Sequence, residues 1–254
     1  MLPRPKKRFG QHFLTDRHYL ARIVEAIDTK AGQAMVEIGP GSGLMTEELV
    51  PRVGHLDVVE IDRELAAALR QRYAPAQLTV HEADALEFDF GALDSPLRVV
   101  GNLPYNVSSP ILFRMVGIAD RLSDCVFMLQ REVVDRMVAE PGTADYGRLS
   151  VMLQYRFAMA MAFAVPPGAF TPPPKVDSAV VRMAPLAADR LRARDEQRFA
   201  QVVAAAFGQR RKTLRNATRA LLGDEAFTRA GIDPGRRGET LSVEEFVALS
   251  DASA

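Results

Sequence analysis

The tetrapeptide Asn102-Leu103-Pro104-Tyr105 brings together groups that could do chemistry on a flat, nitrogen-rich ring. The Asn102 side chain offers a carbonyl acceptor, and Leu103, which precedes a proline, is biased towards an extended backbone that can turn its own carbonyl outward. Tyr105 adds an aromatic ring on which a base can stack. Two acceptors and a stacking surface suit the amine and the face of a flipped-out adenine. A proline turn that merely ends a strand is the alternative explanation.

The elements around the tetrapeptide alternate between strands and helices. An apolar run at 97–101 reads as a buried strand that delivers Asn102, and earlier runs at 34–38, 56–62 and 78–82 are also predicted strands. Helices are expected from Asp16 to Gly32 and from Leu44 to Val50. This alternation predicts an open α/β sheet, in which ligands bind beyond the carboxyl ends of the strands.

The earlier strands end in residues that suit a nucleoside ligand. The first strand is followed by a glycine-rich turn, Gly39-Pro40-Gly41-Ser42-Gly43. Its third glycine comes one place earlier than in the dinucleotide fingerprint. Glu60 lies about 20 residues further on, where a carboxylate grips ribose hydroxyls, although Glu60 or Asp62 could instead cap the next helix. Asp84 follows the third strand and can accept from an adenine amine. Glu37, inside the first strand, suits a ligand with a cationic amino-acid end better than a pyrophosphate.

Composition narrows the class of protein. The 254 residues are 48% hydrophobic and 25% charged, as in ordinary globular proteins, and allow one large and one small domain. A single cysteine, Cys125, rules out an internal disulfide and favours a reducing compartment. The four histidines show no metal-ligand spacing, so no metal is expected. The longest uncharged run, at 157–174, is broken by prolines, so no membrane span is expected.

The net charge is zero, but the basic residues are unevenly placed. The N-terminal arm, residues 3–13, is basic with interleaved aromatics, and 208–219 is basic without a single acid. The N-terminal arm could instead be a frayed tail, and 208–219 could be a solvated helix face. As candidates for binding RNA phosphates we take Arg210, Arg211, Lys212 and Arg215.

Taken together, the motifs resemble one family. The motifs described so far are the glycine-rich turn, the acid after strand two, Asp84 and the tetrapeptide. Three longer stretches accompany them, at 9–14 (FGQHFL), 170–181 (FTPPPKVDSAVV) and 207–216 (FGQRRKTLRN). The chain thereby resembles the bacterial small-subunit ribosomal RNA adenine dimethyltransferases, from its N-terminal arm to its last helix. The resemblance implies a Rossmann-like class I methyltransferase sheet with helices on both faces, followed by a small all-helical domain, and S-adenosyl-L-methionine as methyl donor.

The resemblance also implies roles for individual residues. The donor would be bound by His12, Leu14, Gly39, Gly41, Glu60, Asp84, Ala85 and Asn102. Asn102, Leu103, Pro104 and Tyr105 would be catalytic. Phe170, an exposed ring in a proline-rich loop, would stack on the target base from the side opposite Tyr105. His12 departs from the Asn that many members carry at this position.

We expect residues 1–188 to form the donor-binding catalytic domain and 189–254 a helical RNA-binding domain. The expected partner is ribosomal RNA in the assembling small subunit, and the protein is expected to be cytoplasmic and monomeric. Three rivals were weighed. A related large-subunit adenine methyltransferase would share the Asn102 site and differ in its helical domain. A non-catalytic assembly factor is disfavoured by the intact tetrapeptide, and a nicotinamide oxidoreductase by the glycine spacing.

Overall fold

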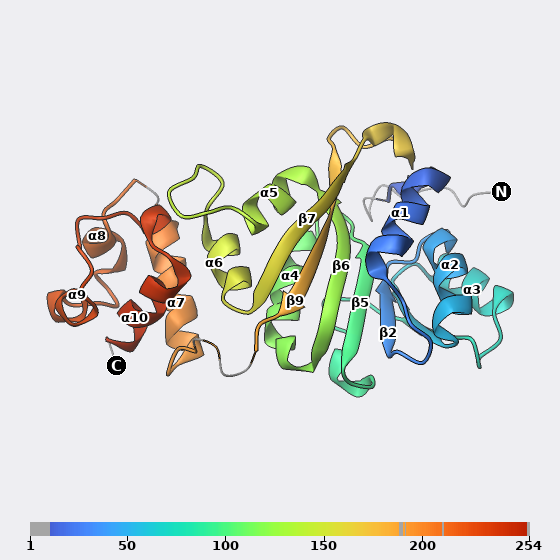
Figure 1. Cartoon of the computed structure of the whole chain (residues 1–254), viewed down its shortest axis with the longest axis horizontal. Coiled ribbons are helices and arrows are strands. Elements are labelled where there is room, and N and C mark those ends of the chain that lie inside the picture. The colour runs from blue at the N-terminus through green and yellow to red at the C-terminus, as the bar shows by residue number, and fades with distance from the viewer. Residues whose placement is uncertain (1–10, 188–189, 191, 210, 253–254) are drawn as a thin grey trace. The chain divides into compact units, whose positions relative to one another are not determined.

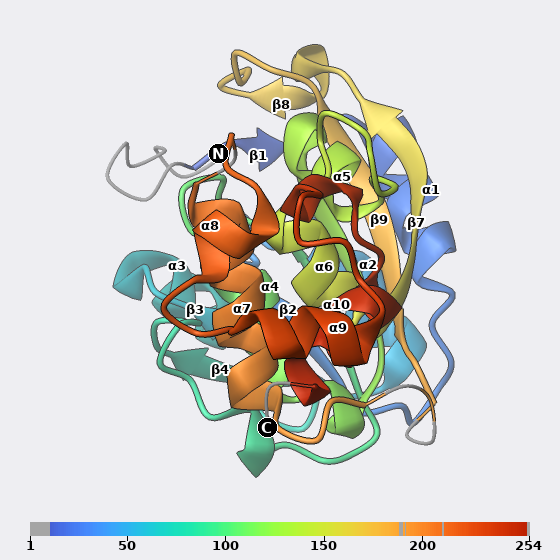
Figure 2. The same ribbon diagram turned by 90° about the vertical axis from the view of Figure 1, so that its left-hand side faces the viewer.

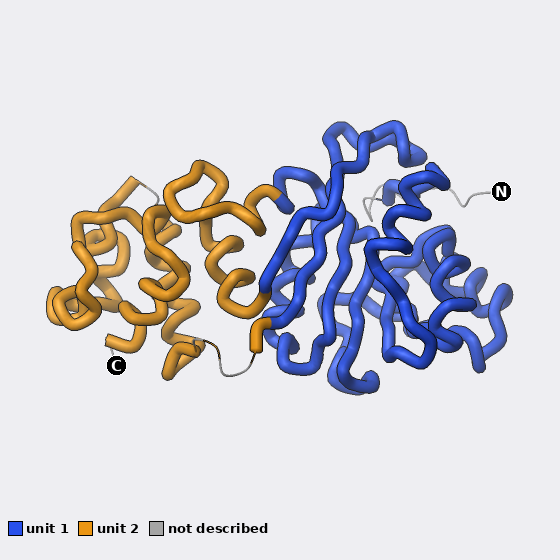
Figure 3. Tube along the Cα trace, in the orientation of Figure 1, with its two compact units in different colours: residues 1–134, 158–185 blue, residues 135–157, 186–254 orange. Residues whose placement is uncertain are grey.

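The computed structural model describes residues 11–187, 190, 192–209 and 211–252. The described chain divides into two compact units, residues 1–134 with 158–185 and residues 135–157 with 186–254 (Figure 3). Arg210 and the basic residues of the N-terminal arm lie outside the described residues.

A seven-stranded sheet forms the first unit, in the order β4-β3-β2-β5-β6-β9-β7. The strands β4, β3, β2, β5 and β6 run parallel, and β9 is antiparallel to β6. Their bounds are β2 Met35–Ile38, β3 Leu56–Glu60, β4 Leu78–Glu82, β5 Leu97–Asn102, β6 Leu122–Gln130, β7 Phe157–Val165 and β9 Ser178–Pro185. Helices α1 and α4 cover opposite faces of this sheet (Figure 1), so the expected Rossmann-like α/β fold is confirmed.

The helices of the first unit are α1 Arg17–Ile27, α2 Leu44–Val53, α3 Arg63–Arg72 and α4 Ser108–Gly117. Asp16 caps α1 by accepting from His18 N and Tyr19 N, as expected for an Asp before an apolar stripe. The helix ends earlier than predicted, because Asp28 takes the left-handed conformation (φ 50°), and Gly32 lies beyond it. Helix α2 continues past Val50 through Pro51.

Two short strands, β1 Phe13–Leu14 and β8 Phe170–Thr171, pair antiparallel (Figure 2). Thr15 N and Asp16 N both donate to the carbonyl of Ala169, which extends the attachment. Residues 13–16 are therefore joined to the segment before β9, far away in sequence.

The apolar sequence of 159–163 (MAMAF) predicts a buried strand, and the segment is a strand, within β7. Its burial was predicted wrongly: most of its residues are exposed or half-buried, and Met161 is 40% exposed. The reason is its place at the edge of the sheet, where β9 is its neighbour in the strand order. An apolar run alone does not distinguish a central strand from an edge strand.

Helices build the second unit: α6 Arg148–Gln154, α7 Glu196–Gly208, α8 Leu214–Thr218, α9 Asp224–Ala230 and α10 Val243–Asp251, while α5 Arg131–Met137 spans the unit boundary. The sequence of 242–245 (SVEE) predicts a capping box, and the box of Ser242 and Glu245 opens α10, with Leu241 and Phe246 fully buried beside it. The unit also contains 135–157, which the sequence analysis assigned to the first domain. Tyr155 packs on Phe199 of α7, with ring centroids 4.3 Å apart, and this long-range contact leaves no local signal.

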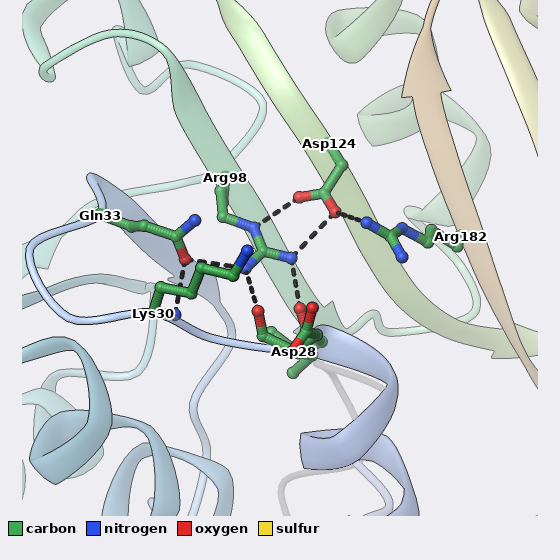
Figure 4. Close-up of polar contacts among 7 residues, drawn as sticks. Asp28, Lys30, Gln33, Arg98, Asp124 and Arg182 are labelled. Atoms are coloured by element: carbon green, nitrogen blue, oxygen red, sulfur yellow. Dashed lines mark hydrogen bonds and ion pairs between the residues drawn. The ribbon is translucent and has the colours of Figure 1, made fainter.

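At the start of β5, a buried arginine ties the sheet to α1 (Figure 4). Arg98 Nε donates to Asp124 Oδ1 (2.7 Å) and Nη2 to Asp124 Oδ2 (2.9 Å). Its Nη1 donates to the Asp28 carbonyl (3.0 Å) and to Gln33 Oε1 (2.9 Å), and Nη2 also reaches the Ile27 carbonyl. All five N–H groups of this guanidinium therefore have acceptors, as a buried charge requires.

Candidate functional site

A cavity of about 300 Å³ lies at the carboxyl ends of the parallel strands. The structure brings into its lining all the residues predicted to bind the donor and the whole tetrapeptide: His12, Leu14, Gly39, Gly41, Glu60, Asp84, Ala85, Asn102, Leu103, Pro104 and Tyr105. Residues from four strand ends and from the N-terminal arm thus meet in one place.

The glycine-rich turn after β2 needs its glycines. Gly39, Gly41 and Gly43 all have positive φ values (65°, 57° and 79°), which other residues rarely adopt. A Cβ at Gly41 would also lie 3.0 Å from the ring of Phe13, which the β1 strand places over the turn. The turn can therefore bring its backbone close to a ligand, and a side chain there would fill the space.

Glu60 closes the other side of this turn. Its Oε2 accepts from Gly41 N (3.1 Å) and its Oε1 from Asp62 N (2.8 Å). The side chain is 3% exposed, and this burial raises the pKa of its carboxyl. The cap of α3 is Asp62, which accepts from Glu64 N, so the alternative role for Glu60 is excluded. Each oxygen of Glu60 keeps a lone pair that can accept from a hydroxyl.

Glu37 is a second buried carboxylate in the cavity lining, only 1% exposed. Burial raises its pKa from 4.5 to about 7, and the charge of Glu60 adds to the effect. Thr46 of α2 donates to Glu37 Oε2 at 2.6 Å, and this hydrogen bond lowers the pKa and so offsets part of the rise. Thr46 was missed by sequence reasoning, because nothing local marks the partner of a buried acid.

The loop after β4 is held in place from two directions. Asp84 Oδ1 accepts from Leu86 N (2.8 Å), which shapes the turn itself. Arg114, on α4, donates to the carbonyls of Leu86 and Phe88. The helix that begins just after the tetrapeptide therefore holds the loop that carries Asp84. The role of Arg114 was also not predicted.

At the mouth of the cavity, Asn102 Nδ2 donates to the carbonyl of His12 (3.1 Å). This bond sets the orientation of the amide, so its Oδ1 is the atom available as an acceptor. Leu103 N donates to Met128 O (3.1 Å), and among the described residues no donor reaches the Leu103 carbonyl. Two acceptors from adjacent residues are thus available here.

Tyr105 is held by hydrogen bonds to both its side chain and its backbone. Its hydroxyl pairs with Ser178 Oγ (2.7 Å), and its backbone carbonyl accepts from Ser108 Oγ (3.1 Å). The sequence indicates that a serine before Pro110 could cap α4, but Val107 occupies the cap position and Ser108 donates to Tyr105 instead. Partial burial raises the pKa of the Tyr105 phenol, so the hydroxyl stays neutral near pH 7.

Phe170 does not lie where the sequence analysis placed it. It is 3% exposed, belongs to the hydrophobic core cluster and is not part of the cavity lining. The expectation of an exposed ring opposite Tyr105 is therefore wrong. The cause is the pairing with β1: alternation along β8 turns Phe170 inward and Thr171 outward.

The described residues of the basic stretch belong to the helical unit and are not among the residues that line the cavity. Arg211 and Lys212 are exposed in the turn between α7 and α8 and not on a helix face. Arg215, on α8, is also exposed, and its Nε pairs with Asp224 at 3.0 Å. The expectation that this whole stretch is without acidic partners is therefore wrong for Arg215, because its partner comes from α9.

Among the described residues, no group of three or more His, Cys, Asp or Glu side chains is arranged to hold a metal ion. None of the helices described is both long and apolar enough to cross a bilayer.

Comparison with known proteins agrees with this geometry. Residues 3–254 match the family described as ribosomal RNA adenine dimethylase. A ribosomal RNA small subunit methyltransferase A from Aromatoleum aromaticum is 60% identical over 98% of this chain and 94% of its own length. A solved dimethyladenosine transferase from Plasmodium falciparum shares the fold, with a TM-score of 0.81 at 24% identity, covering 94% of this chain and 96% of that one. The 23S rRNA methyltransferase ErmE has a TM-score of 0.71 at 28% identity, covering 94% and 98%.

Proposed function

The chain belongs to the ribosomal RNA adenine dimethylase family and is an S-adenosylmethionine-dependent enzyme that dimethylates adenines of small-subunit ribosomal RNA, and we propose that the cavity described above is where the methyl transfer takes place. One observation carries this proposal. The glycine-rich turn, Glu60, Asp84 and the tetrapeptide line the same cavity, so a donor and a target base would meet there.

The residues of the cavity fit S-adenosylmethionine. Glu60 would accept from the ribose hydroxyls, and Asp84 from the adenine amine of the donor. Glu37, a buried carboxylate in the cavity lining, would face its cationic amino group. The turn at Gly41 leaves the room that a Cβ would take.

When bound, the donor supplies a methyl group activated by a sulfonium. The protein's own contribution is to prepare the target nitrogen, whose lone pair is delocalised into the adenine ring. The Asn102 Oδ1 and the Leu103 carbonyl would each accept one amine hydrogen, which favours a pyramidal nitrogen with a directed lone pair. This is positioning and transition-state stabilisation, without a general base in the protein. The methylated amine then loses its proton to water.

RNA binding is assigned to the helical unit. Arg211 and Lys212 are exposed cations suited to phosphate contacts, and Arg215 would have to exchange its Asp224 partner for a phosphate. We assign Arg210 to the same surface from the sequence alone. We further propose that the enzyme acts as a cytoplasmic monomer on the assembling small subunit. The ribosomal substrate supports the cytoplasm as the compartment.

The test is mass spectrometry of ribosomal RNA from cells with the gene, without it, and with Asn102→Ala in its place. Dimethyladenosine should be present in the small-subunit RNA of the first and absent from the other two. Loss of dimethyladenosine from large-subunit RNA would instead favour the large-subunit methyltransferase considered above. The chain is 60% identical to a small-subunit enzyme and 28% identical to a 23S rRNA enzyme, which argues against that alternative. Dimethylation that persists with Asn102→Ala would contradict the proposed site.

A further inference from the structure

The loop after β4 is a compact turn that begins at Asp84. The Asp84 carbonyl accepts from Glu87 N and Phe88 N, both at 2.9 Å, and its side-chain Oδ1 accepts from Leu86 N at 2.8 Å. Asp84 lines the cavity, whereas residues 86–88 are not among the lining residues. The position of the Asp84 carboxylate in the cavity therefore depends on a turn whose other end is not part of the lining.

Arg114 of α4 holds that other end of the turn. Its Nη1 donates to the Leu86 carbonyl and its Nη2 to the Phe88 carbonyl. The guanidinium thus bridges two carbonyls of the turn with its rigid fork of N–H groups. It also lies 5.7 Å from the centre of the buried Phe90 ring, which is within the range of a cation–π contact. Hydrogen bonds and packing together therefore fix the place of this side chain.

The helix that carries Arg114 is itself part of the site. Ile111 of α4 lines the cavity, and Ser108 in the first turn of the helix donates to the carbonyl of Tyr105 at 3.1 Å. Arg114 follows Ile111 on the same helix but is not among the lining residues. Any effect of Arg114 on a ligand must therefore pass through the turn that it holds.

The chemistry of the purine makes the placement of Asp84 matter. The 6-amino group of adenine donates hydrogen bonds, whereas a 6-oxo purine presents an acceptor at the same position. The Asp84 Oδ1 is engaged by Leu86 N, which leaves Oδ2 to accept from the amine. A carboxylate held in place pairs with the amine and meets the 6-oxo group as a second acceptor, but a carboxylate that can turn away loses both effects.

We propose that Arg114 is a positioning residue for the methyl donor. By holding the far end of the Asp84 turn, it fixes the carboxylate against the donor's adenine amine and so sets the preference for an adenine-bearing donor over a 6-oxo analogue. The inference deepens the proposed function and rests on its assignment of Asp84 to the donor's adenine.

The experiment is calorimetry of the full-length protein with S-adenosylhomocysteine and with S-inosylhomocysteine, in which a 6-oxo group replaces the amine. The readout is the ratio of the two dissociation constants, because a general loosening of the cavity weakens both ligands together and leaves the ratio unchanged. Arg114→Met removes the guanidinium, and Arg114→Lys keeps the charge but loses the fork. Asp84→Ala removes the carboxylate itself.

Arg121→Met is the matched control. Arg121 also bridges two backbone carbonyls of the connection between β4 and β5, because its Nη2 donates to Gly91 O (3.1 Å) and to Leu93 O (2.9 Å). It therefore makes the same kind of contact as Arg114, but beyond the Asp84 turn.

The parent should bind S-adenosylhomocysteine about 10-fold more tightly than the 6-oxo analogue, or better, as expected for a hydrogen bond to a charged group. Arg114→Met should reduce this ratio by about 5-fold or more, and Arg114→Lys by a smaller but measurable factor. Arg121→Met should match the parent.

An unchanged ratio in either folded Arg114 variant, while Asp84→Ala loses the preference, would overturn the proposal and leave the donor site in place. An equal loss in Arg121→Met would also overturn it, because the effect would then belong to the whole connection. A parent without any preference for the amine would instead refute the assignment of Asp84 in the proposed function.

Discussion

The buried Glu37 carboxyl makes the stability of this enzyme depend on pH. Its pKa is raised by burial from 4.5 to about 7. Between these values the folded protein keeps a proton that the unfolded chain releases, so the contribution of this carboxyl to stability is fully present below pH 4.5 and is lost as the pH rises through about 7. Replacement by Gln keeps the size and an acceptor for Thr46 and removes the charge.

The magnitude follows from the two pKa values. The difference between 4.5 and about 7 corresponds to about 3 kcal/mol. Glu37→Gln should therefore be more stable than the parent by up to about 3 kcal/mol at pH 8 and nearly equal to it at pH 4. Donor binding should weaken in the same variant, because the ionised carboxylate would be the partner of the donor's amino group.

Urea unfolding of both proteins at a series of pH values measures this effect. The chain has no tryptophan, so circular dichroism and tyrosine fluorescence are the suitable probes. Glu87→Gln, an exposed glutamate after β4, is the matched control and should track the parent. A gap between Glu37→Gln and the parent that does not grow from pH 4 to pH 8 would refute the reasoning.

Four further predictions concern stability, donor, RNA and chemistry. Arg98→Met should cost about 3–5 kcal/mol of unfolding free energy by urea titration, because it leaves Asp124 buried with one remaining partner, Arg182. Glu60→Ala should weaken donor binding by about 1.5–3 kcal/mol in calorimetry, the range for hydrogen bonds to a charged group. Charge reversal at Arg211 and Lys212 should weaken RNA binding and flatten its salt dependence, with donor binding intact. Asn102→Ala should abolish both methyl transfers, and in the parent the second transfer should be the slower, because monomethyladenine has one amine hydrogen left for two acceptors.

Each of these has a result that would contradict it. A folded Arg98→Met variant as stable as the parent would show that the ion pair is dispensable. Unchanged donor affinity in Glu60→Ala would remove the ribose assignment. An unaltered salt slope would move the main RNA contact to the N-terminal arm. In a single-turnover course on unmethylated small-subunit particles, resolved by mass, monomethyladenosine should rise and then fall; equal rates for both steps would mean that the lost hydrogen bond does not matter.

The parts of the fold that the sequence predicted well are those with local causes. Strand β4, the cap at Asp16 and the capping box of α10 each follow from neighbouring residues and their period. The parts predicted wrongly depend on distant partners. The exposure of β7 follows from its place in the strand order, and the inclusion of 135–157 in the helical unit follows from packing on α7.

The candidate site divides in the same way. The glycine turn, Glu60 and Asp84 could be placed in one cavity from strand order alone, because the carboxyl ends of parallel strands meet at one edge. The partners of these residues could not be predicted. Thr46 and Arg114 have no motif, and the burial of Phe170 is decided by β1, whose register no local pattern reveals.

The pairing of β1 with β8 also bears on how the enzyme is made and how it opens. Phe13 pairs with Thr171, so the arm cannot take its place over the cavity until the ribosome has synthesised the chain beyond that residue. A ladder of two residue pairs that closes so long a loop is held by few bonds, and such elements exchange their amide protons through local opening, ahead of the sheet. We therefore expect residues 11–14 to be the last part of the cavity lining to form and the first to open, while the parallel strands stay folded.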